Sequence, residues 1–206
     1  MGEILSNKTE NKSFRFINVK FIKSASKKEE FIDDELPQVA IVGRSNVGKS
    51  SLINLLTNNS KMAKTSSMPG RTRLVNYFNV NNQMYMVDLP GYGFAKASKN
   101  LTSAWDKVMN DYFTDNEKLK LVLVLIDSRI LPTDLDMQMM DYLAEHEIPA
   151  LIVMTKTDKL NRSETNLNKD KISKMLRYNK ELIIPTSTLK RVGVEEISNK
   201  INAYLN

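Results

Sequence analysis

The chain has 206 residues, of which 41% are apolar and 26% are charged, so it is long enough for one soluble domain with a full core. It contains no cysteine, which excludes disulfides, thiol catalysis and thiolate metal sites. Its net charge of +6 and its pI of about 9.3 favour a polyanionic partner, of which RNA or a nucleoprotein is the simplest.

Residues 1–13 are polar and carry no apolar segment of the kind found in a secretory signal. We therefore expect a flexible tail at residues 1–13 and a single domain over residues 14–206. No apolar run approaches the ~18 residues of a membrane-spanning helix, so no membrane association is expected. These features favour a cytoplasmic monomer.

The first half of the chain alternates between strand and helix patterns. In chain order we expect an edge strand within residues 14–25, a buried strand at 39–42, a helix at 51–58, a long exposed loop at 59–73, and strands at 74–80 and 83–88. Asn81 and Asn82 are expected to form the tight turn between the last two strands. A loop as long as 59–73, with little apolar periodicity, is usually functional or disordered.

The second half continues this alternation after a glycine-rich segment, residues 88–100. We expect a helix at 102–113, a buried strand at 121–126, a helix opened by a capping box at Thr133 and Asp136, a strand at 150–154, a basic helix at 162–178, a short strand at 182–184 and a closing helix near 194–205. The inward faces of the second and third of these helices should carry Leu135, Met139, Tyr142 and Leu143, and Ile172, Met175 and Leu176, respectively. The alternation predicts an α/β fold with a mostly parallel central sheet and helices on both faces.

The sequence GRSNVGKS, residues 43–50, matches the phosphate-binding loop pattern G-x-x-x-x-G-K-[ST]. It lies between a predicted strand and a predicted helix, which is the context that this motif requires. Gly43 and Gly48 let the backbone curl, so that several N–H groups and the helix N-terminus face an anion. Lys49 is expected to reach the β- and γ-phosphates of a nucleotide, and the Ser50 hydroxyl is expected to bind Mg²⁺.

A second segment, DLPG at residues 88–91, stands at the end of a predicted strand. A carboxylate at Asp88 can hold Mg²⁺, usually through water, while the Gly91 N–H can contact the γ-phosphate. The pattern D-x-P-G is also common in turns, so it does not decide the matter alone. Asp127, at the end of the strand 121–126, resembles the metal-binding aspartate of ATPases more closely. If Asp127 held the metal, an ATPase would be the better interpretation.

The tetrapeptide TKTD, residues 155–158, follows the strand 150–154, at the end where parallel sheets bind ligands. Guanine presents N–H donors at N1 and N2 side by side and one carboxylate can accept both, whereas adenine has an acceptor at N1. Asp158 is therefore the predicted guanine reader, and the Lys156 stem can cover the base. The segment 186–188, Thr-Ser-Thr, could line the base edge or form an ordinary loop.

The order GRSNVGKS, PGRT (69–72), DLPGYG (88–93), TKTD and then the Ser187 loop resembles translation-factor-class P-loop GTPases with a Ras-like architecture. SNVGKSSLIN, SSMPGRTRLVNYF and DLPGYGFA are most similar to the EngB family of bacterial ribosome-biogenesis GTPases, also called YihA or YsxC. The resemblance covers residues 21–205. It implies GTP binding, slow hydrolysis to GDP and phosphate, Mg²⁺, and association with the large ribosomal subunit and its RNA. It also implies a link to normal cell division and septation.

The resemblance assigns further roles to individual residues. It makes Thr72 the switch threonine that binds Mg²⁺ in the GTP state. The expected metal ligands are Ser50, Thr72 and Asp88, and the expected catalytic residues are Lys49, Thr72 and Gly91. The residues expected to contact GTP are Gly43, Arg44, Ser45, Asn46, Val47, Gly48, Lys49, Ser50, Ser51, Gly70, Arg71, Thr72, Asp88, Leu89, Pro90, Gly91, Thr155, Lys156, Thr157, Asp158, Thr186, Ser187 and Thr188.

Three positions depart from the pattern of many GTPases or resemble a special subgroup. Tyr92 stands where many carry a water-orienting glutamine, which implies slow unassisted hydrolysis. Thr155 stands where many carry asparagine, and the shorter hydroxyl is expected to hold the base loop less firmly to the phosphate loop. Asn46 resembles the asparagine that binds K⁺ in potassium-activated GTPases, which makes K⁺ a candidate activator.

Two other functions stay open at this point, namely a non-hydrolysing, nucleotide-dependent RNA- or ribosome-binding module and a P-loop ATPase. The expected RNA contacts are Lys96 and Lys99 near the second loop, and Lys190 and Arg191 near the base loop. The basic helix 162–178 is either a solvated face or a further RNA-facing patch. His146 is expected at a helix end on the surface rather than in catalysis.

Overall fold

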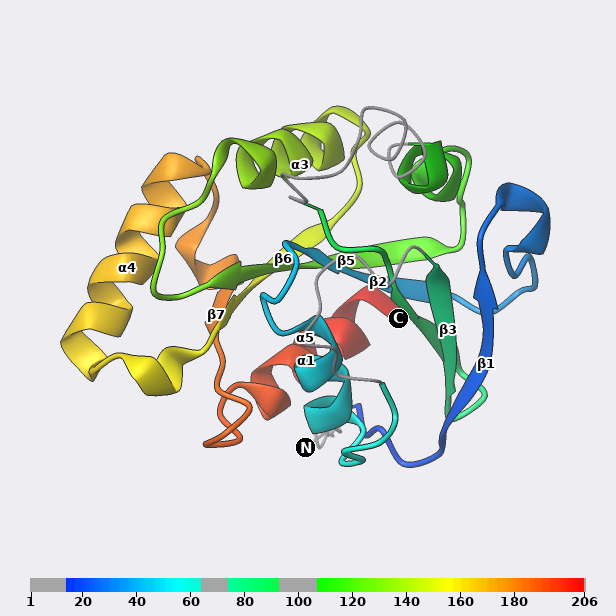
Figure 1. The fold of residues 1–206 in the computed structure, drawn as a ribbon, viewed down its shortest axis with the longest axis horizontal. Helices are drawn as coiled ribbons and strands as arrows, with labels where there is room; N and C mark the ends of the chain where they lie inside the picture. Colours follow the sequence, from blue (N-terminus) through cyan, green and yellow to red (C-terminus); the bar gives the residue numbers. More distant parts are fainter. Residues whose placement is uncertain (1–13, 64–73, 93–106, 206) are drawn as a thin grey trace, which may run out of the picture.

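The computed structural model describes residues 14–63, 74–92 and 107–205, and its centre is a seven-stranded sheet (Figure 1). The strands are β1 (Val19–Ala25), β2 (Gln38–Gly43), β3 (Val75–Val80), β4 (Met84–Asp88), β5 (Leu119–Asp127), β6 (Ala150–Thr155) and β7 (Ile183–Pro185). Their order across the sheet is β1-β3-β4-β2-β5-β6-β7. Strands β4, β2, β5, β6 and β7 pair in parallel, whereas β3 is antiparallel to both of its neighbours. The predicted mostly parallel sheet is therefore confirmed.

Helices cover both faces of this sheet, as Figure 1 shows. The described α-helices with full bounds are α1 (Lys49–Leu56), α3 (Asp134–Glu145), α4 (Arg162–Met175) and α5 (Val194–Leu205), and residues 107–113 are also helical. One buried cluster joins the sheet to α3, α4 and the 107–113 helix, and a second joins it to α1 and α5. Because β2 and β5 send side chains into both clusters, their sequences are continuously apolar rather than alternating.

The edge strand predicted within residues 14–25 is β1, which pairs only with β3. The predicted turn at Asn81 and Asn82 is also present. Both residues have positive φ angles, of 57° and 55°, which asparagine tolerates better than most residues. The chain therefore reverses sharply between β3 and β4, and β4 is left beside β2.

Two helix details differ from the sequence-based expectation. In α3 the buried stripe is Asp136, Met140 and Leu143, and Leu135 is 42% exposed. Met140 and Leu143 follow Asp136 at helical spacing. Asp136 itself caps the helix, because its carboxylate accepts hydrogen bonds from the N–H and the hydroxyl of Thr133. In α4, Ile172 is buried but Met175, the last residue of the helix, is 39% exposed.

Several boundaries also differ, and some expected elements lie outside the described residues. Helix α1 begins at Lys49, two residues earlier than expected, and α4 ends at Met175. The expected tail 1–13, most of the loop 59–73 and the start of the helix 102–113 fall outside the described ranges. Among the helices that can be described, none combines the length and the apolar character needed to cross a bilayer.

Candidate nucleotide-binding site

The phosphate loop joins the carboxyl end of β2 to the first turn of α1 (Figure 1). Gly48 caps α1 with a φ of 116°, a backbone conformation that favours glycine. A Cβ at Gly43 would lie 2.8 Å from Val47 Cγ1 and 2.9 Å from the Leu125 carbonyl oxygen, so a side chain there would displace the loop. The two glycines named by the motif are thus required by backbone geometry and by packing, respectively.

The loop's lysine lies beside the segment that ends β4. Lys49 Nζ is 4.0 Å from Asp88 Oδ1, and it would lie 3.1 Å from a Cβ built on Gly91. Asp88 is 5% exposed, and burial raises the pKa of its carboxyl, while the Lys49 charge and a hydrogen bond from Asn76 oppose that rise. The fold therefore brings Lys49 beside the distant segment that holds Asp88 and Gly91, and all three residues were predicted to act on phosphate or metal.

The donor set at this place fits Mg²⁺. Asp88 Oδ1 is buried and has no hydrogen-bond partner among the described residues. A buried carboxylate oxygen without a donor is stabilised by a cation. No cluster of three or more acidic or histidine side chains occurs in the described part of the chain, and Mg²⁺ at nucleotide sites needs only one or two carboxylates plus phosphate oxygens. Ser50, in the first turn of α1, supplies a hydroxyl next to Lys49.

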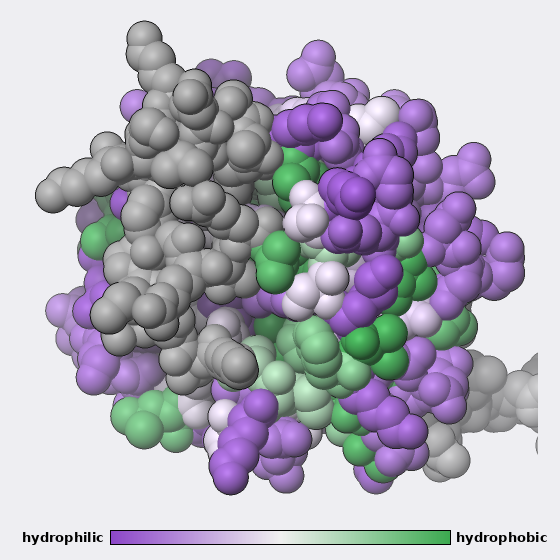
Figure 2. All heavy atoms as spheres, turned by 45° about the vertical axis from the view of Figure 1, so that its right-hand side comes forward, coloured by the Kyte–Doolittle hydropathy of each residue, from purple (hydrophilic) through white to green (hydrophobic). Residues whose placement is uncertain are grey.

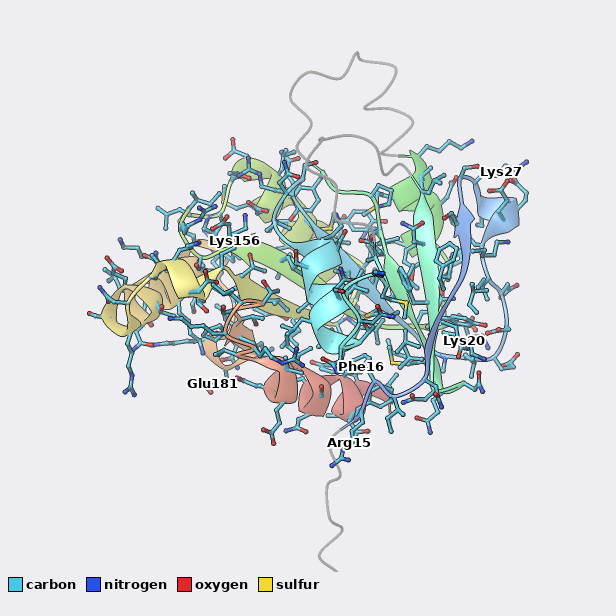
Figure 3. The ribbon with its side chains drawn as sticks, turned by 60° about the horizontal axis from the view of Figure 1, so that its bottom comes forward. Arg15, Phe16, Lys20, Lys27, Lys156 and Glu181 are labelled. Carbon is cyan, nitrogen blue, oxygen red and sulfur yellow. The ribbon has the colours of Figure 1, made fainter. Side chains whose placement is uncertain are left out.

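The base loop is bonded directly to the phosphate loop. The buried Thr155 hydroxyl donates to the Val47 carbonyl oxygen at 2.8 Å, so this shorter side chain does reach across the gap. The Lys156 ammonium donates to the Asn46 carbonyl oxygen at 2.8 Å, and Figure 3 shows where Lys156 lies. Lys156 itself has a left-handed backbone, with a φ of 60°. These two bonds fix the carboxyl ends of β2 and β6 relative to each other.

Asp158, the predicted guanine reader, faces the loop that follows β7. The Ser187 hydroxyl donates to Asp158 Oδ1 at 2.8 Å, and this hydrogen bond lowers the pKa of the Asp158 carboxyl. The side chain of Asp158 is only 9% exposed, and the residue lies in the short 3-10 turn Thr157–Lys159 that follows β6. An ionised carboxylate oxygen has more than one lone pair, so the Ser187 bond leaves acceptor capacity for a ligand.

The three residues of segment 186–188 differ in their surroundings. The Thr186 hydroxyl is buried and donates to the Ile184 carbonyl oxygen, so it serves the end of β7. Ser187 is the member that contacts Asp158, and Thr188 is exposed. The main-chain carbonyl oxygen of Thr186 also accepts a hydrogen bond from the Thr157 N–H at 3.2 Å. Within this segment Ser187 is the residue whose side chain bonds to Asp158, the predicted guanine reader.

The Tyr92 side chain is buried and bonded to α3. It is 3% exposed, and its hydroxyl donates to Asp136 Oδ1 in the first turn of α3 at 2.9 Å. Its main chain is bonded to the phosphate loop, through Ser45 N–H at 3.0 Å and the Gly43 carbonyl oxygen at 3.2 Å. Burial and the Asp136 charge raise the pKa of Tyr92 well above its ordinary value, so the phenol stays protonated. The side chain therefore anchors this segment to α3.

Asp127, the competing metal candidate, is occupied by protein cations. Lys156 Nζ lies 2.9 Å and Arg129 Nη2 lies 2.8 Å from Asp127 Oδ2. Burial alone would raise the pKa of Asp127, but the hydrogen bonds from Arg129 and Lys156 outweigh it and lower the pKa to about 2. Asp127 therefore holds Lys156 in place, whereas Asp88 keeps a free oxygen. This contrast favours Asp88 over the ATPase-like arrangement.

A cavity of about 210 Å³ borders the phosphate loop on the side of α3. Its lining includes Arg44, Asn46, Asp127, Asp136 and Lys156. Both of its acids are already bonded to protein groups, Asp127 to Lys156 and Asp136 to Tyr92. The cavity lies between the phosphate loop and α3, and neither of its carboxylates is left unpaired to bind a metal ion.

Some of the remaining predicted residues lie in the described part of the chain and others lie outside it. Ser51 lies in α1, Leu89 is fully buried and donates its N–H to the Ile41 carbonyl oxygen, and Pro90 follows it. Gly70, Arg71 and Thr72 lie outside the described residues, as do Lys96 and Lys99, so their roles stay predictions. His146 is at the exposed end of α3, where it stacks on Tyr142.

A phosphate loop joined to a base loop, at the carboxyl edge of a mostly parallel sheet, defines a P-loop GTPase. A model of the family described as 50S ribosome-binding GTPase matches residues 38–156. A probable GTP-binding protein EngB from Mesoplasma florum is 46% identical over 178 residues, which is 85% of this chain and 90% of that protein. The chain belongs to the EngB family of GTP-binding proteins.

A further relative agrees with this assignment, and solved structures match the fold. A probable GTP-binding protein EngB from Thermoanaerobacter pseudethanolicus is 41% identical over 90% of this chain and 97% of its own length. The crystal structure of a probable GTP-binding protein EngB matches the fold with a TM-score of 0.69 at 22% identity, over 82% of this chain and 98% of that one. Era in complex with MgGDPNP and a segment of 16S ribosomal RNA matches with a TM-score of 0.65 at 27% identity, over 84% of this chain and 57% of that one.

Proposed function

We propose that this GTPase is a slow GTP-dependent switch in the assembly of the large ribosomal subunit, and that normal cell division and septation need it. We further propose that it acts in the cytoplasm as a monomer. The observation that carries the switch is the direct bonding of the base loop to the phosphate loop through Thr155 and Lys156. These bonds hold the two loops as one unit, which supports the proposal that a base and its phosphates are bound together. The family description, with its reference to the 50S subunit, supports the choice of partner.

The proposed division of labour follows from the geometry. Lys49 would hold the β- and γ-phosphates, and the Gly91 N–H would contact the γ-phosphate. Asp88 and Ser50, with Thr72, would hold Mg²⁺, which when bound neutralises charge on the phosphate oxygens. Asp158 would accept the two guanine N–H donors while Ser187 keeps the carboxylate oriented.

Hydrolysis is expected to be slow because Tyr92 is bonded to α3 and cannot orient a water molecule. We expect an unassisted rate on the order of 10⁻⁴ to 10⁻² s⁻¹, which release of phosphate from GTP would measure. K⁺ is proposed to raise this rate through Asn46, whose backbone has a φ of 63° at the crest of the phosphate loop. Equal rates in K⁺ and Na⁺, in the wild type and in Asn46→Ala, would remove the K⁺ proposal. Fast turnover in both salts would show that a catalytic group has been missed.

Docking on ribosomal RNA is proposed to use Lys190 and Arg191, which are exposed beside the base loop. The Lys190 main-chain N–H donates to the Ser187 hydroxyl at 3.0 Å, and that hydroxyl donates to Asp158. Ser187 therefore links this basic pair to Asp158. Counterion release predicts that affinity falls by about 10³ to 10⁵ between about 50 and 200 mM salt if roughly six to ten phosphates are contacted. Changing Lys190 and Arg191 to alanine should weaken binding and lower the salt slope by about two.

The measurement is co-sedimentation with isolated large ribosomal subunits over a salt series, with a GTP analogue and with GDP. A matched control changes Lys20 and Lys27 to alanine, because these lysines lie at the β1 edge, opposite β7 (Figure 3). In Figure 2 the coloured atoms of that side are mostly hydrophilic, with a smaller apolar group. The exposed large apolar residues of β1 are Phe21 and Ile22. Equal losses for both pairs would indicate a generic basic surface. Binding that ignores nucleotide would contradict the switch.

A further inference from the structure

A row of polar side chains crosses the sheet toward the phosphate loop. Ser24 on β1 pairs in register with Asn76 on β3, and Asn76 pairs with Asp88 on β4. Directly paired residues of neighbouring antiparallel strands send their side chains to the same face of a sheet. On this face, Asp88 approaches Lys49 at the start of α1. The row therefore runs from the outer edge of the sheet to the proposed metal site.

The hydrogen bonds of this row have a defined direction. The Ser24 hydroxyl donates to Asn76 Oδ1 at 2.6 Å. Because the carbonyl end of the amide is held on the β1 side, its NH₂ end is directed to the opposite side, where β4 lies. Hydrogen bonding from Asn76 is also one of the influences on the Asp88 carboxyl. The amide of Asn76 thus links an exposed serine to a buried carboxylate.

We propose that Asn76 is a positioning residue for Mg²⁺: it anchors the Asp88 carboxylate so that Oδ1 stays free for the ion, and Ser24 orients the Asn76 amide. The free state of Asp88 Oδ1 among the described residues is what this anchoring explains. A carboxylate that could rotate in its pocket would turn toward Lys49, which is 4.0 Å away, and form a closer ion pair. This inference rests on the proposed role of Asp88 in holding Mg²⁺.

The effect should be specific to the metal. Residues that hold a metal ligand in place typically change metal affinity by about 10- to 100-fold when they are replaced. Asn76→Leu keeps the approximate size of the side chain but removes the donor, so we expect about a tenfold or larger rise in the Mg²⁺ concentration needed for half-maximal effect. Affinity for GDP in the presence of EDTA should change less than about twofold, because Asn76 does not belong to the phosphate loop or the base loop.

The test titrates Mg²⁺ into the purified full chain with a fluorescent GDP and follows nucleotide dissociation, which Mg²⁺ slows. The matched control is Asn79→Leu, on the same strand but on the opposite face, where Asn79 accepts from the Asn82 N–H. This control should leave the Mg²⁺ midpoint unchanged. Thermal unfolding in EDTA checks that each variant is folded.

Ser24 provides a second, milder test, since it is exposed on an edge strand. Ser24→Ala should shift the Mg²⁺ midpoint in the same direction as Asn76→Leu but by less. Ser24→Thr keeps the hydroxyl, so its Mg²⁺ midpoint should equal that of the wild type. An unchanged midpoint in Asn76→Leu, or an equal loss of affinity with and without Mg²⁺, would overturn the inference. A wild-type protein whose nucleotide binding ignores Mg²⁺ would instead overturn the proposed metal role of Asp88.

Discussion

Changing Lys49 to alanine is expected to abolish Mg²⁺-dependent GTP binding at micromolar concentrations. Among the residues that the structure describes, Lys49 is the cation that pairs with the buried Asp88, and its ammonium lies close to Gly91. Loss of one partner from a buried charged contact typically costs about 2–5 kcal/mol or more in binding. Calorimetry with GTP and Mg²⁺ measures the loss, and thermal unfolding without nucleotide should show that the fold persists.

The fold should survive because the phosphate loop is built by its own backbone. Gly48 caps α1, and Val47 N–H bonds to the Arg44 carbonyl oxygen at 3.1 Å, without help from the lysine side chain. Ser50→Ala should likewise remove Mg²⁺-dependent binding, whereas Lys171→Ala on α4 is a matched control that should bind normally. Tight Mg²⁺-dependent GTP binding in both loop variants would mean that this loop does not hold the nucleotide.

Changing Asp158 to alanine is expected to weaken GTP binding by roughly 2–5 kcal/mol, because it removes the acceptor for both guanine donors. The Ser187 hydroxyl, which donates to this carboxylate at 2.8 Å, would also lose its partner. Competition of GTP and of ATP against a labelled GTP analogue measures the change. In the wild type, ATP should compete poorly, and in Asp158→Ala the preference for GTP should largely disappear.

Ser187→Ala separates the base reader from its support. It keeps the carboxylate, so GTP affinity should fall less than in Asp158→Ala while the preference over ATP remains. Asp170→Ala, an acidic residue on α4, is the control for the loss of one negative charge. Equal GTP affinity in the wild type and in Asp158→Ala would refute the guanine assignment, and strong competition by ATP would revive the ATPase interpretation.

Local sequence patterns predicted the larger features of this fold well. Six consecutive apolar residues at 121–126 indicate a strand buried on both faces, and this stretch is the core of β5. The capping box at Thr133 and Asp136 marked the start of α3. Such signals succeed because hydrophobic burial and helix capping act over a few neighbouring residues. The predictions for the inward faces of α3 and α4 were wrong at Leu135 and Met175, because the buried face of a helix depends on which elements pack against it.

The phosphate loop and the TKTD segment were also predictable, since their chemistry is carried by a short contiguous backbone. The order of those motifs along the chain sufficed to indicate the family before any contact was known. The roles of Thr72 and its neighbours stay predictions. The sequence already favoured Asp88 over Asp127 as the metal ligand, because Pro90 and Gly91 follow Asp88 and Asp158 suits guanine. It could not show how each carboxylate is paired, because both end an apolar strand.

By itself, the sequence determined the alternating α/β architecture and the phosphate-loop motif, and it predicted Asp158 as the guanine reader, which stays a prediction. Only the tertiary structure decided which aspartate keeps a free oxygen, because Lys156 and Arg129 pair with Asp127 and leave Asp88 beside Lys49. It also decided that Tyr92 bonds to Asp136, 44 residues later, and that Asn76 lies between Ser24 and Asp88. These contacts join residues far apart in the chain, and their existence depends on strand order and register, which no local pattern encodes.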